Sequence, residues 1–288
     1  MNAPQDIVAR AGEALVALRA RRPRVHCLMN TVVQKFVADG LSAMGTLPSM
    51  TSSVDEIAHF VAGADGLLIN LGTLDAARRE AIGIAVETAN AHGLRWCLDP
   101  VHCDASPPRF AFAKSLIAKG PAVVRGNRQE MERLVGSADH LQFTPNPSPQ
   151  GAGELGVGAS VSPSPLRGGV RGGGIHTLRS PIVFVQTGPR DQVWSGDEAI
   201  DIANGHEWLA LTTGTGCLTG ALISAFLSVE PYPVVAAAAA LLAIGVAAEI
   251  AADESRGPGS FVSALIDALH ALDPNTLRDR ARISHAET

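Results

Sequence analysis

Short apolar runs alternate with amphipathic stretches from residue 24 to residue 135. The apolar runs are RVHCLM (24–29), GLLINLG (66–72), RWCLDP (95–100) and AVVRGN (122–127). The stretches with helical spacing include Thr31 to Met44, Val54 to Ala62 and Asp75 to His92. Brief hydrophobic runs separated by helices are typical of parallel strands joined by helical crossovers, in a sheet buried on both faces. The pattern therefore predicts an α/β fold with a mostly parallel central sheet.

Further elements are predicted at both ends of the chain. Residues 1–23 have the spacing of an amphipathic helix, and PIVFVQTG (181–188) and VWSG (193–196) are strand-like. After them, a Gly-rich turn at 212–217 opens one helix, the alanine-rich run 234–248 forms a second, and GPGSF (257–261) begins the last. Nearer the start, Ser53 with Glu56 three residues later predicts a capping box for the 54–62 helix.

Between about residues 142 and 177 the composition changes to Gly, Pro and Ser, with the near-repeat NPSP and SPSP. Such a segment cannot bury enough apolar area to offset the entropy lost on ordering it. We therefore predict one domain over residues 1–288 with a disordered surface insertion at about 142–177. A glycine-rich phosphate loop is the alternative, which the lack of a preceding strand disfavours.

Composition and charge narrow the class of protein. With 288 residues, 46% of them hydrophobic, the chain can form one large α/β domain with a sizeable core. The net charge of −5 and the scattered basic residues argue against a nucleic-acid surface. Four cysteines without a CxxC pair favour reduced thiols. Because the N-terminus lacks signal-peptide features and the run 234–248 is too short to span a bilayer comfortably, we expect a cytoplasmic protein with no membrane segment.

Polar residues follow the predicted strands. They are Asn30, Asn70, Asp99 and Arg125. In doubly wound α/β proteins, functional groups gather at the carboxyl ends of the strands. This edge of the sheet is therefore the expected location of a site.

The strongest local signal is the segment from Thr212 to Cys217 (TTGTGC), which directly precedes the helical run LTGALISAFLSV. Its glycines let the backbone approach a ligand closely, and the free N–H groups of the first helical turn form an anion site. At that position the helix dipole is expected to lower the pKa of the Cys217 thiol. The alternative is a tight turn with a structural cysteine.

Two acidic positions have both a structural and a functional interpretation. Asn127 and Glu130, in RGNRQE, form an ordinary helix start if Asn127 is the N-cap and Glu130 the N3 residue. Glu130 is alternatively an acid that holds Mg²⁺ through water. Asp99, before Pro100, carries the same ambiguity.

The segment VHCLMNTVVQKFVADGLSAMGTLPSM resembles the N-terminal signature of the hydroxyethylthiazole kinase family, a branch of the ribokinase-like superfamily. The resemblance continues in the family's order through LINLGT, LDPV, VRGNRQE, VQTG, NGH, TGTGC and GPGSF. Most ribokinase-like enzymes carry Asp where this chain has Cys217, whereas the thiazole kinases carry Cys. The resemblance implies a three-layer αβα sandwich without a lid, and a homotrimer that uses ATP and Mg²⁺ to phosphorylate 4-methyl-5-(2-hydroxyethyl)thiazole in thiamine salvage.

The resemblance also implies residues on the substrate side of the site. Met50 is expected to contact the thiazole with Asn30 close by, and Gly214 to line the substrate site. Cys217 is expected to face the substrate hydroxyl, as a weak base or a positioning group. Because phosphoryl transfer needs little early proton abstraction, a cysteine can stand where relatives use a carboxylate.

On the nucleotide side, the resemblance implies that Arg125, Thr187 and Gly216 bind ATP. Asp99 and Glu130 are expected to serve the Mg²⁺–phosphate region. Arg125 and Mg²⁺ would neutralise charge that develops on the transferred phosphoryl group.

The chain departs from the family where LDPV is usually followed by a small Gly-rich turn, because here His102, Cys103 and Asp104 follow. A metal site is conceivable, but adjacent side chains rarely converge on one ion, so a substituted turn is the preferred interpretation. The alternatives for function are a hydroxymethylpyrimidine kinase, an ATP-dependent hydrate dehydratase, or a nucleotide-binding relative without catalysis.

Overall fold

The computed structural model describes residues 3–136, 181–196 and 198–286. All the strands in these residues belong to one sheet, in the order β2-β1-β3-β4-β5-β6-β7-β8-β9. The strands are β1 (Arg24–Leu28), β2 (Leu47–Ser49), β3 (Gly66–Asn70), β4 (Trp96–Asp99), β5 (Val123–Asn127), β6 (Val183–Thr187), β7 (Asp191–Ser195), β8 (Glu198–Ile202) and β9 (Ile283–His285). The pairs from β2 to β6 are parallel and the last three are antiparallel. The mostly parallel sheet is confirmed.

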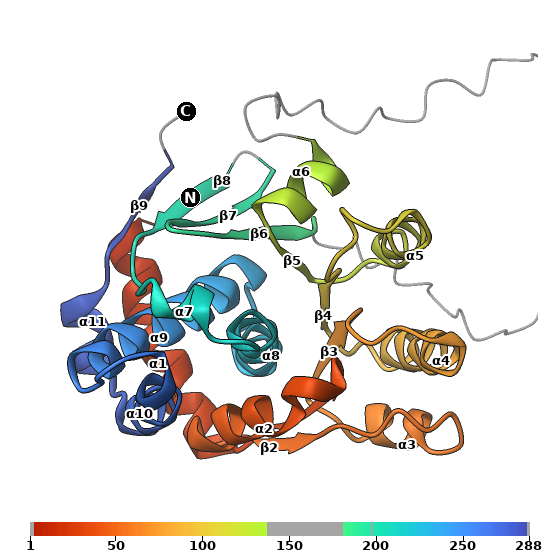
Figure 1. Cartoon of the computed structure of the whole chain (residues 1–288), viewed down its shortest axis with the longest axis horizontal. Helices are drawn as coiled ribbons and strands as arrows, with labels where there is room; N and C mark the ends of the chain where they lie inside the picture. The colour runs from red at the N-terminus through yellow and green to blue at the C-terminus, as the bar shows by residue number, and fades with distance from the viewer. Residues whose placement is uncertain (1–2, 137–180, 197, 287–288) are drawn as a thin grey trace, which may run out of the picture.

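Helices cover both faces of the sheet, which gives the predicted three layers (Figure 1). One face carries α1 (Pro4–Arg21), η1 (Thr31–Val33), α2 (Gln34–Ala43), α7 (Trp208–Leu211), α8 (Thr215–Leu227), α9 (Pro233–Asp253), α10 (Pro258–Ala271) and α11 (Pro274–Arg280). The other carries α3 (Ile57–Ala62), α4 (Ala76–Ala91), α5 (Pro107–Ile117) and α6 (Arg128–Val135). Successive strand residues point to opposite faces, so Leu68 joins the first core while Leu67 and Ile69 join the second.

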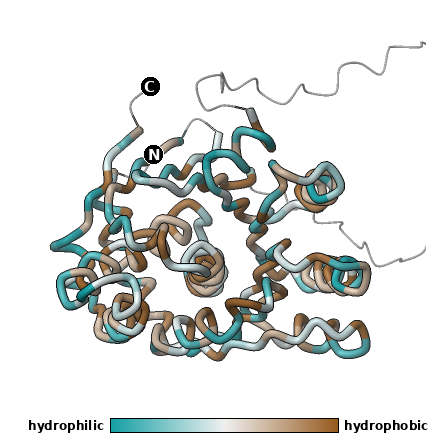
Figure 2. The backbone as a smooth tube through the Cα atoms, viewed as in Figure 1, coloured by the Kyte–Doolittle hydropathy of each residue, from teal (hydrophilic) through white to brown (hydrophobic). Residues whose placement is uncertain are grey.

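Helix α8 is buried along almost its whole length, and this fixes its first turn against the sheet. Figure 2 shows the apolar residues concentrated in the central strands and in α8 and α9. A Cβ on Gly66 would lie 2.4 Å from the backbone oxygen of Ser224, so only glycine lets β3 and α8 pack this closely. The amino end of α8 is thereby held at the edge of the sheet where β3 and β4 end.

Helix α9 is longer than the apolar run 234–248 from which it was predicted. It runs from Pro233 to Asp253, and its 21 residues are long and apolar enough to cross a membrane by length and composition. However, 83% of its 18-residue apolar stretch is buried inside the protein, and the helix packs against α1, α8 and α10. The predicted core helix is confirmed, and its apolar character is explained by that packing.

The predicted capping box at Ser53 is not formed. Helix α3 begins at Ile57, and its N-cap is Glu56. The Glu56 carboxylate accepts a hydrogen bond from the Thr51 hydroxyl, and Ser53 contributes its backbone oxygen to the N–H groups of Glu56 and Ile57. The Glu56 carboxylate therefore binds the Thr51 hydroxyl and not the Ser53 N–H, which donates to Thr51 Oγ1. The predicted insertion at about 142–177 lies outside the described residues.

Candidate active site

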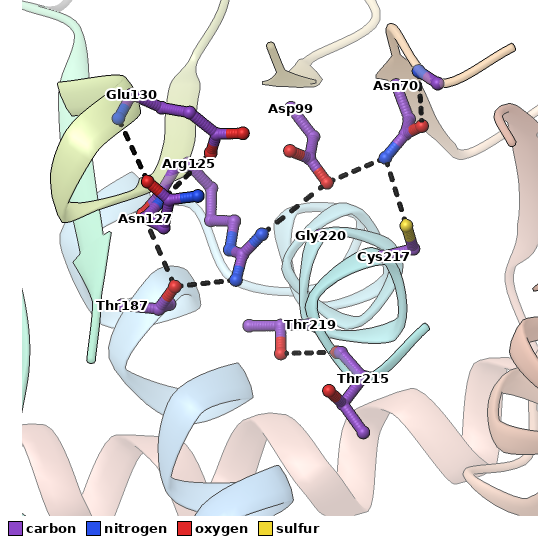
Figure 3. Close-up of polar contacts among 12 residues, drawn as sticks. Asn70, Asp99, Arg125, Asn127, Glu130, Thr187, Thr215, Cys217, Thr219 and Gly220 are labelled. Atoms are coloured by element: carbon purple, nitrogen blue, oxygen red, sulfur yellow. Dashed lines mark hydrogen bonds and ion pairs between the residues drawn. The ribbon is translucent and has the colours of Figure 1, made fainter. Parts of the chain in front are cut away.

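The carboxyl ends of three neighbouring strands meet the amino end of α8 at one edge of the sheet (Figure 3). Asn70 ends β3, Asp99 ends β4, and Arg125 lies two residues before the end of β5. Cys217 is in the first turn of α8. The fold thus brings together polar residues that the strand ends and the Gly-rich turn predicted separately.

Asn70 connects the acid, the thiol and the backbone at this edge. Its side-chain N–H groups donate to Asp99 Oδ2 at 2.7 Å and to Cys217 Sγ at 3.3 Å. Its Oδ1 accepts from the backbone N–H of Gly72 at 3.0 Å and of Asn30 at 3.3 Å. Since both backbone donors need the oxygen, only one orientation of the amide satisfies all four contacts. Sequence reasoning placed Asn70 at a strand end but missed that it joins Asp99 to Cys217.

The Arg125 guanidinium is held on two sides. Its Nη1 lies 3.7 Å from Asp99 Oδ2, and its Nη2 donates to Thr187 Oγ1 at 2.6 Å. The Arg125 side chain is 12% exposed and that of Asp99 is fully buried, so water screens this pair weakly. Thr187 in turn donates to the backbone oxygen of Gly126 at 3.3 Å. The guanidinium is therefore a fixed positive charge, as recognition of a phosphate requires.

Two glycines shape the start of α8. A Cβ on Gly216 would lie 2.8 Å from Arg125 Nη1, so any side chain there would displace the guanidinium. Gly214 is the N-cap and has a φ of 101°, which other residues rarely adopt, and a Cβ there would lie 2.8 Å from Val33 Cγ1. Packing thus explains why the turn is glycine-rich, and it keeps the first helical turn open to an anion.

A cavity of about 710 Å³ opens beside these groups. It is lined by residues from the ends of β5 and β6, from the loop before α7, and from the beginning of α8, including Arg125, Asn127, Thr187, Asp191, His206 and Gly216. This volume suits a small-molecule site. Sequence reasoning missed Asp191. Burial raises the pKa of its carboxyl to about 6, although the hydrogen bond from the Gly188 N–H opposes the increase.

The expectation that the helix dipole lowers the pKa of the Cys217 thiol is wrong. Burial raises the pKa of the Cys217 thiol to about 12, and the charge of Asp99 adds to the increase while Arg125 opposes it. Desolvation of a thiolate outweighs the attraction of a helix N-terminus in this setting. Cys217 is thus a neutral thiol at neutral pH, which favours a positioning role over a basic one.

Asp99 is the acid whose charge state is most altered. Burial raises its pKa to about 7, against the opposing charge of Arg125 and the hydrogen bond from Asn70, while the nearby Glu130 adds to the increase. Its Oδ1 is buried and has no hydrogen-bond partner among the described residues. A buried unpaired carboxylate oxygen is costly, so a cation or a ligand donor is the natural partner of this atom.

Glu130 has the structural role that the sequence allowed. Its Oε2 accepts from the Asn127 N–H at 2.9 Å, and Asn127 Oδ1 accepts from the Glu130 N–H at 2.9 Å, so the capping box at the start of α6 is formed. The other carboxylate oxygen, Oε1, accepts from the backbone N–H of His102 at 2.7 Å. Side-chain ligand atoms of His102, Asp104 and Glu130 all lie within 4.8 Å of one another.

The two residues expected to border the thiazole lie at the same edge of the sheet. Asn30 follows β1 and caps η1, since its Oδ1 accepts from the Val32 N–H at 3.0 Å and from the Thr73 hydroxyl at 2.9 Å. Met50 follows β2, the neighbouring strand, and is partly buried against the main core. The backbone of Asn30 is tied to the Asn70 side chain, but no hydrogen bond connects Met50 to this network within the described residues.

Comparisons with known proteins agree with this geometry. The sequence model of the hydroxyethylthiazole kinase family matches residues 15–143 and 175–275, more than half of the chain. A protein of Agrobacterium fabrum named probable hydroxyethylthiazole kinase is 44% identical over 287 residues, which cover 100% of both chains. The hydroxyethylthiazole kinase of Granulibacter bethesdensis is 40% identical over 268 residues, 93% of this chain and 92% of that one. This chain belongs to the hydroxyethylthiazole kinase family.

Solved structures extend the likeness of this hydroxyethylthiazole kinase family member to three dimensions. The hydroxyethylthiazole kinase of Pyrococcus horikoshii has a TM-score of 0.79 at 31% identity and covers 96% of this chain and 99% of its own. A ribokinase-like superfamily protein of Enterococcus faecalis has a TM-score of 0.52 at 15% identity, which shows the fold alone. The expected ribokinase-like fold is confirmed.

Membership in the hydroxyethylthiazole kinase family, with full-length relatives, assigns the chain the activity of those kinases in thiamine biosynthesis. A kinase takes ATP as its phosphoryl donor, so ATP is the co-substrate. The full-length relatives favour the thiazole alcohol over the pyrimidine kinase and dehydratase alternatives.

Proposed function

We propose that the Asn70–Asp99–Arg125–Cys217 edge is where the γ-phosphoryl group of ATP passes to the hydroxyl of 4-methyl-5-(2-hydroxyethyl)thiazole. The observation that carries the proposal is the Asn70 amide, which holds the Asp99 carboxylate and the Cys217 thiol together beside the cavity. Phosphoryl transfer demands alignment and charge stabilisation more than covalent chemistry from the protein. The hydrogen-bonded network would supply the alignment. The Arg125 guanidinium and the N–H groups at the start of α8 would supply the charge stabilisation.

The two substrates would enter from opposite sides of Cys217. ATP would occupy the cavity, with its phosphates against Arg125, Thr187 and Gly216. The thiazole would lie toward Met50 and Asn30, with Gly214 lining its site. In this arrangement Cys217, whose sulfur already accepts a hydrogen bond from Asn70, would orient the substrate hydroxyl.

Mg²⁺ fits the acidic side of the site. The unpaired Asp99 Oδ1 and the nearby Glu130 carboxylate are oxygen donors of the kind that Mg²⁺ prefers. We propose that these two acids hold it, in part through water. When bound, Mg²⁺ would neutralise charge on the phosphates of ATP.

We also propose a homotrimer that works in the cytoplasm. Large apolar side chains are exposed on β2, in the loop that follows it and on α3, at Leu47 (42%), Val54 (37%) and Phe60 (41%). Exposed apolar side chains on consecutive elements support a subunit contact beside the proposed thiazole site. Light scattering on the purified chain tests this contact, since a trimer has three times the mass of one chain.

Replacing Cys217 with alanine should lower kcat by about 10²-fold, because a misplaced substrate hydroxyl costs about that much while the phosphate-binding groups remain. Binding of ATP should change little. Cys217→Asp should retain substantial activity, since a carboxyl oxygen can accept the Asn70 N–H in place of the sulfur, and most ribokinase-like enzymes carry Asp where this chain has Cys217. Steady-state kinetics on both variants, with thermal melts to confirm folding, measure this.

Two outcomes would count against the role of Cys217. Wild-type turnover by Cys217→Ala would make the cysteine a purely structural residue. A folded but inactive Cys217→Asp would show that a carboxylate cannot take its place.

A further inference from the structure

We propose that His102, Asp104 and Glu130 form a binding site for one divalent transition-metal ion that the chain holds without nucleotide. The three side chains come from the turn after β4 and from the first turn of α6. Each offers one ligand atom, and these atoms all lie within 4.8 Å of one another. Atoms that ligate one Zn²⁺-sized ion at about 2.0–2.2 Å lie no more than about 4.4 Å apart, so a small side-chain rotation closes the set.

The turn conformation explains how residues 102 and 104 reach the same ion. Cys103 between them is buried, and its thiol lies 3.8 Å from the backbone oxygen of Glu130. Its two neighbours in the turn are less buried, since His102 is exposed and Asp104 is partly exposed. The third ligand comes from another element, so adjacent side chains need not supply the whole site.

The ligand atoms are free to bind. The His102 imidazole is exposed, and within the described residues it makes no hydrogen bond. Asp104 Oδ1 is buried and also has no hydrogen-bond partner there. Glu130 is 4% exposed and is held by the N–H groups of Asn127 and His102, and each of its oxygens keeps a second lone pair. A buried carboxylate oxygen without a partner, on a residue whose ligand atom lies within 4.8 Å of those of His102 and Glu130, is an arrangement that a cation relieves.

The backbone at His102 also sets this turn apart. Its φ is 59°, in the left-handed region that glycine adopts most readily. A histidine occupies this position, although glycine would form the turn with less strain. The turn conformation itself therefore gives no reason for an imidazole at this position.

The donor set indicates the class of metal. One imidazole nitrogen with two carboxylate oxygens suits ions of the Mn²⁺ to Zn²⁺ series, whereas a purely oxygen set suits Mg²⁺ or Ca²⁺. The site shares Glu130 with the magnesium ligands proposed above. Its test contains no nucleotide, so its failure and the failure of the proposed kinase site can be told apart.

The experiment titrates Co²⁺ into the tag-free full chain and follows binding by visible absorption and calorimetry, with Zn²⁺ as competitor. One Co²⁺ should bind with a weak d–d spectrum of nitrogen and oxygen ligands, and Zn²⁺ should displace it. His102→Gly and Asp104→Asn should each weaken binding by about 10-fold or more, since even indirect partners of metal ligands cost that much. His270→Ala, which removes another exposed imidazole, should leave the affinity unchanged.

His102→Gly keeps the test independent of folding, because glycine favours the left-handed turn. The variant should therefore melt at the wild-type temperature or above. The proposal is overturned if wild type and His102→Gly bind Co²⁺ equally well, or if wild type binds it no more tightly than about 1 mM. An intense sulfur-to-cobalt charge-transfer band would also overturn it, since a thiol would then be the ligand.

Discussion

Asp99→Asn is expected to lower kcat by roughly 10³-fold, the upper end of what one preorganised electrostatic contact contributes to a rate. The substitution removes the acid that faces Arg125 at 3.7 Å and accepts from Asn70 at 2.7 Å. It also removes one of the two carboxylates proposed to hold Mg²⁺. The charge that faces Arg125 and the proposed magnesium ligand are lost together, although the new amide oxygen can still accept from Asn70, so the effect should exceed that of Cys217→Ala.

The same variant should gain stability relative to wild type as the pH rises. Burial raises the pKa of Asp99 from 3.8 to about 7, so the folded protein keeps a proton that the unfolded chain releases between about pH 4 and pH 7. The contribution of Asp99 to the free energy of unfolding therefore falls as pH rises through that window. Asparagine does not ionise, so the melting temperature of Asp99→Asn relative to wild type should increase from pH 4 to pH 7 and then level off.

Steady-state kinetics and melts across this pH range test both halves of the prediction. Glu132→Gln, which removes an exposed acid of the same helix as Glu130, is the matched control and should change neither quantity appreciably. A constant melting-temperature difference from pH 4 to pH 7 would show that Asp99 is ionised throughout. Near wild-type turnover would remove Asp99 from the site.

Arg125→Met is expected to lower kcat/KM by roughly 10²–10³-fold, because a fixed guanidinium stabilises charge on the transferred phosphoryl group. Methionine keeps much of the apolar bulk beside Gly216 but has no charge and no donor. Arg125→Lys should recover only part of the loss, since an ammonium cannot reach Asp99 and Thr187 with the same fork.

Calorimetric ATP binding and steady-state kinetics should both respond to Arg125→Met. Arg278→Met on α11 serves as the control, because that residue does not line the cavity. If Arg125→Met binds ATP with wild-type affinity and turns over at the wild-type rate, the guanidinium only supports the fold.

The strands that form the site could be predicted because they are buried on both faces. β3, in GLLINLG, and β4, in RWCLDP, are continuous apolar runs, and helices follow both. β2, β8 and β9 were missed for the opposite reason. β2 and β9 have three residues each and lie at the sheet edges, and EAIDI in β8 lacks a long apolar run.

The site was predictable as a set of positions but not as a set of contacts. Strand ends placed Asp99 and Arg125 at one edge, and the TGTGC turn marked Cys217 separately as part of an anion site. They did not show that Asn70 joins two of them, because that depends on how closely α8 packs on β3. The pKa of Cys217 was misjudged because the sequence showed a helix N-terminus and not the burial that outweighs it.

Convergence over long sequence separations was the other missing information. His102 and Asp104 looked like a substituted turn, since two nearby side chains seldom form a metal site alone. Glu130 completes the set from another element, and only the fold shows that its oxygens face this turn.

The central claim is that this chain transfers phosphate from ATP to the thiazole alcohol. Incubation of the purified full chain with ATP, Mg²⁺ and 4-methyl-5-(2-hydroxyethyl)thiazole, followed by mass spectrometry of the products, tests it most directly. Thiazole phosphate and ADP should form in equal amounts, and hydroxymethylpyrimidine in place of the thiazole should give little product. Folded protein that binds ATP but forms no thiazole phosphate, or that phosphorylates the pyrimidine alcohol instead, would contradict the account.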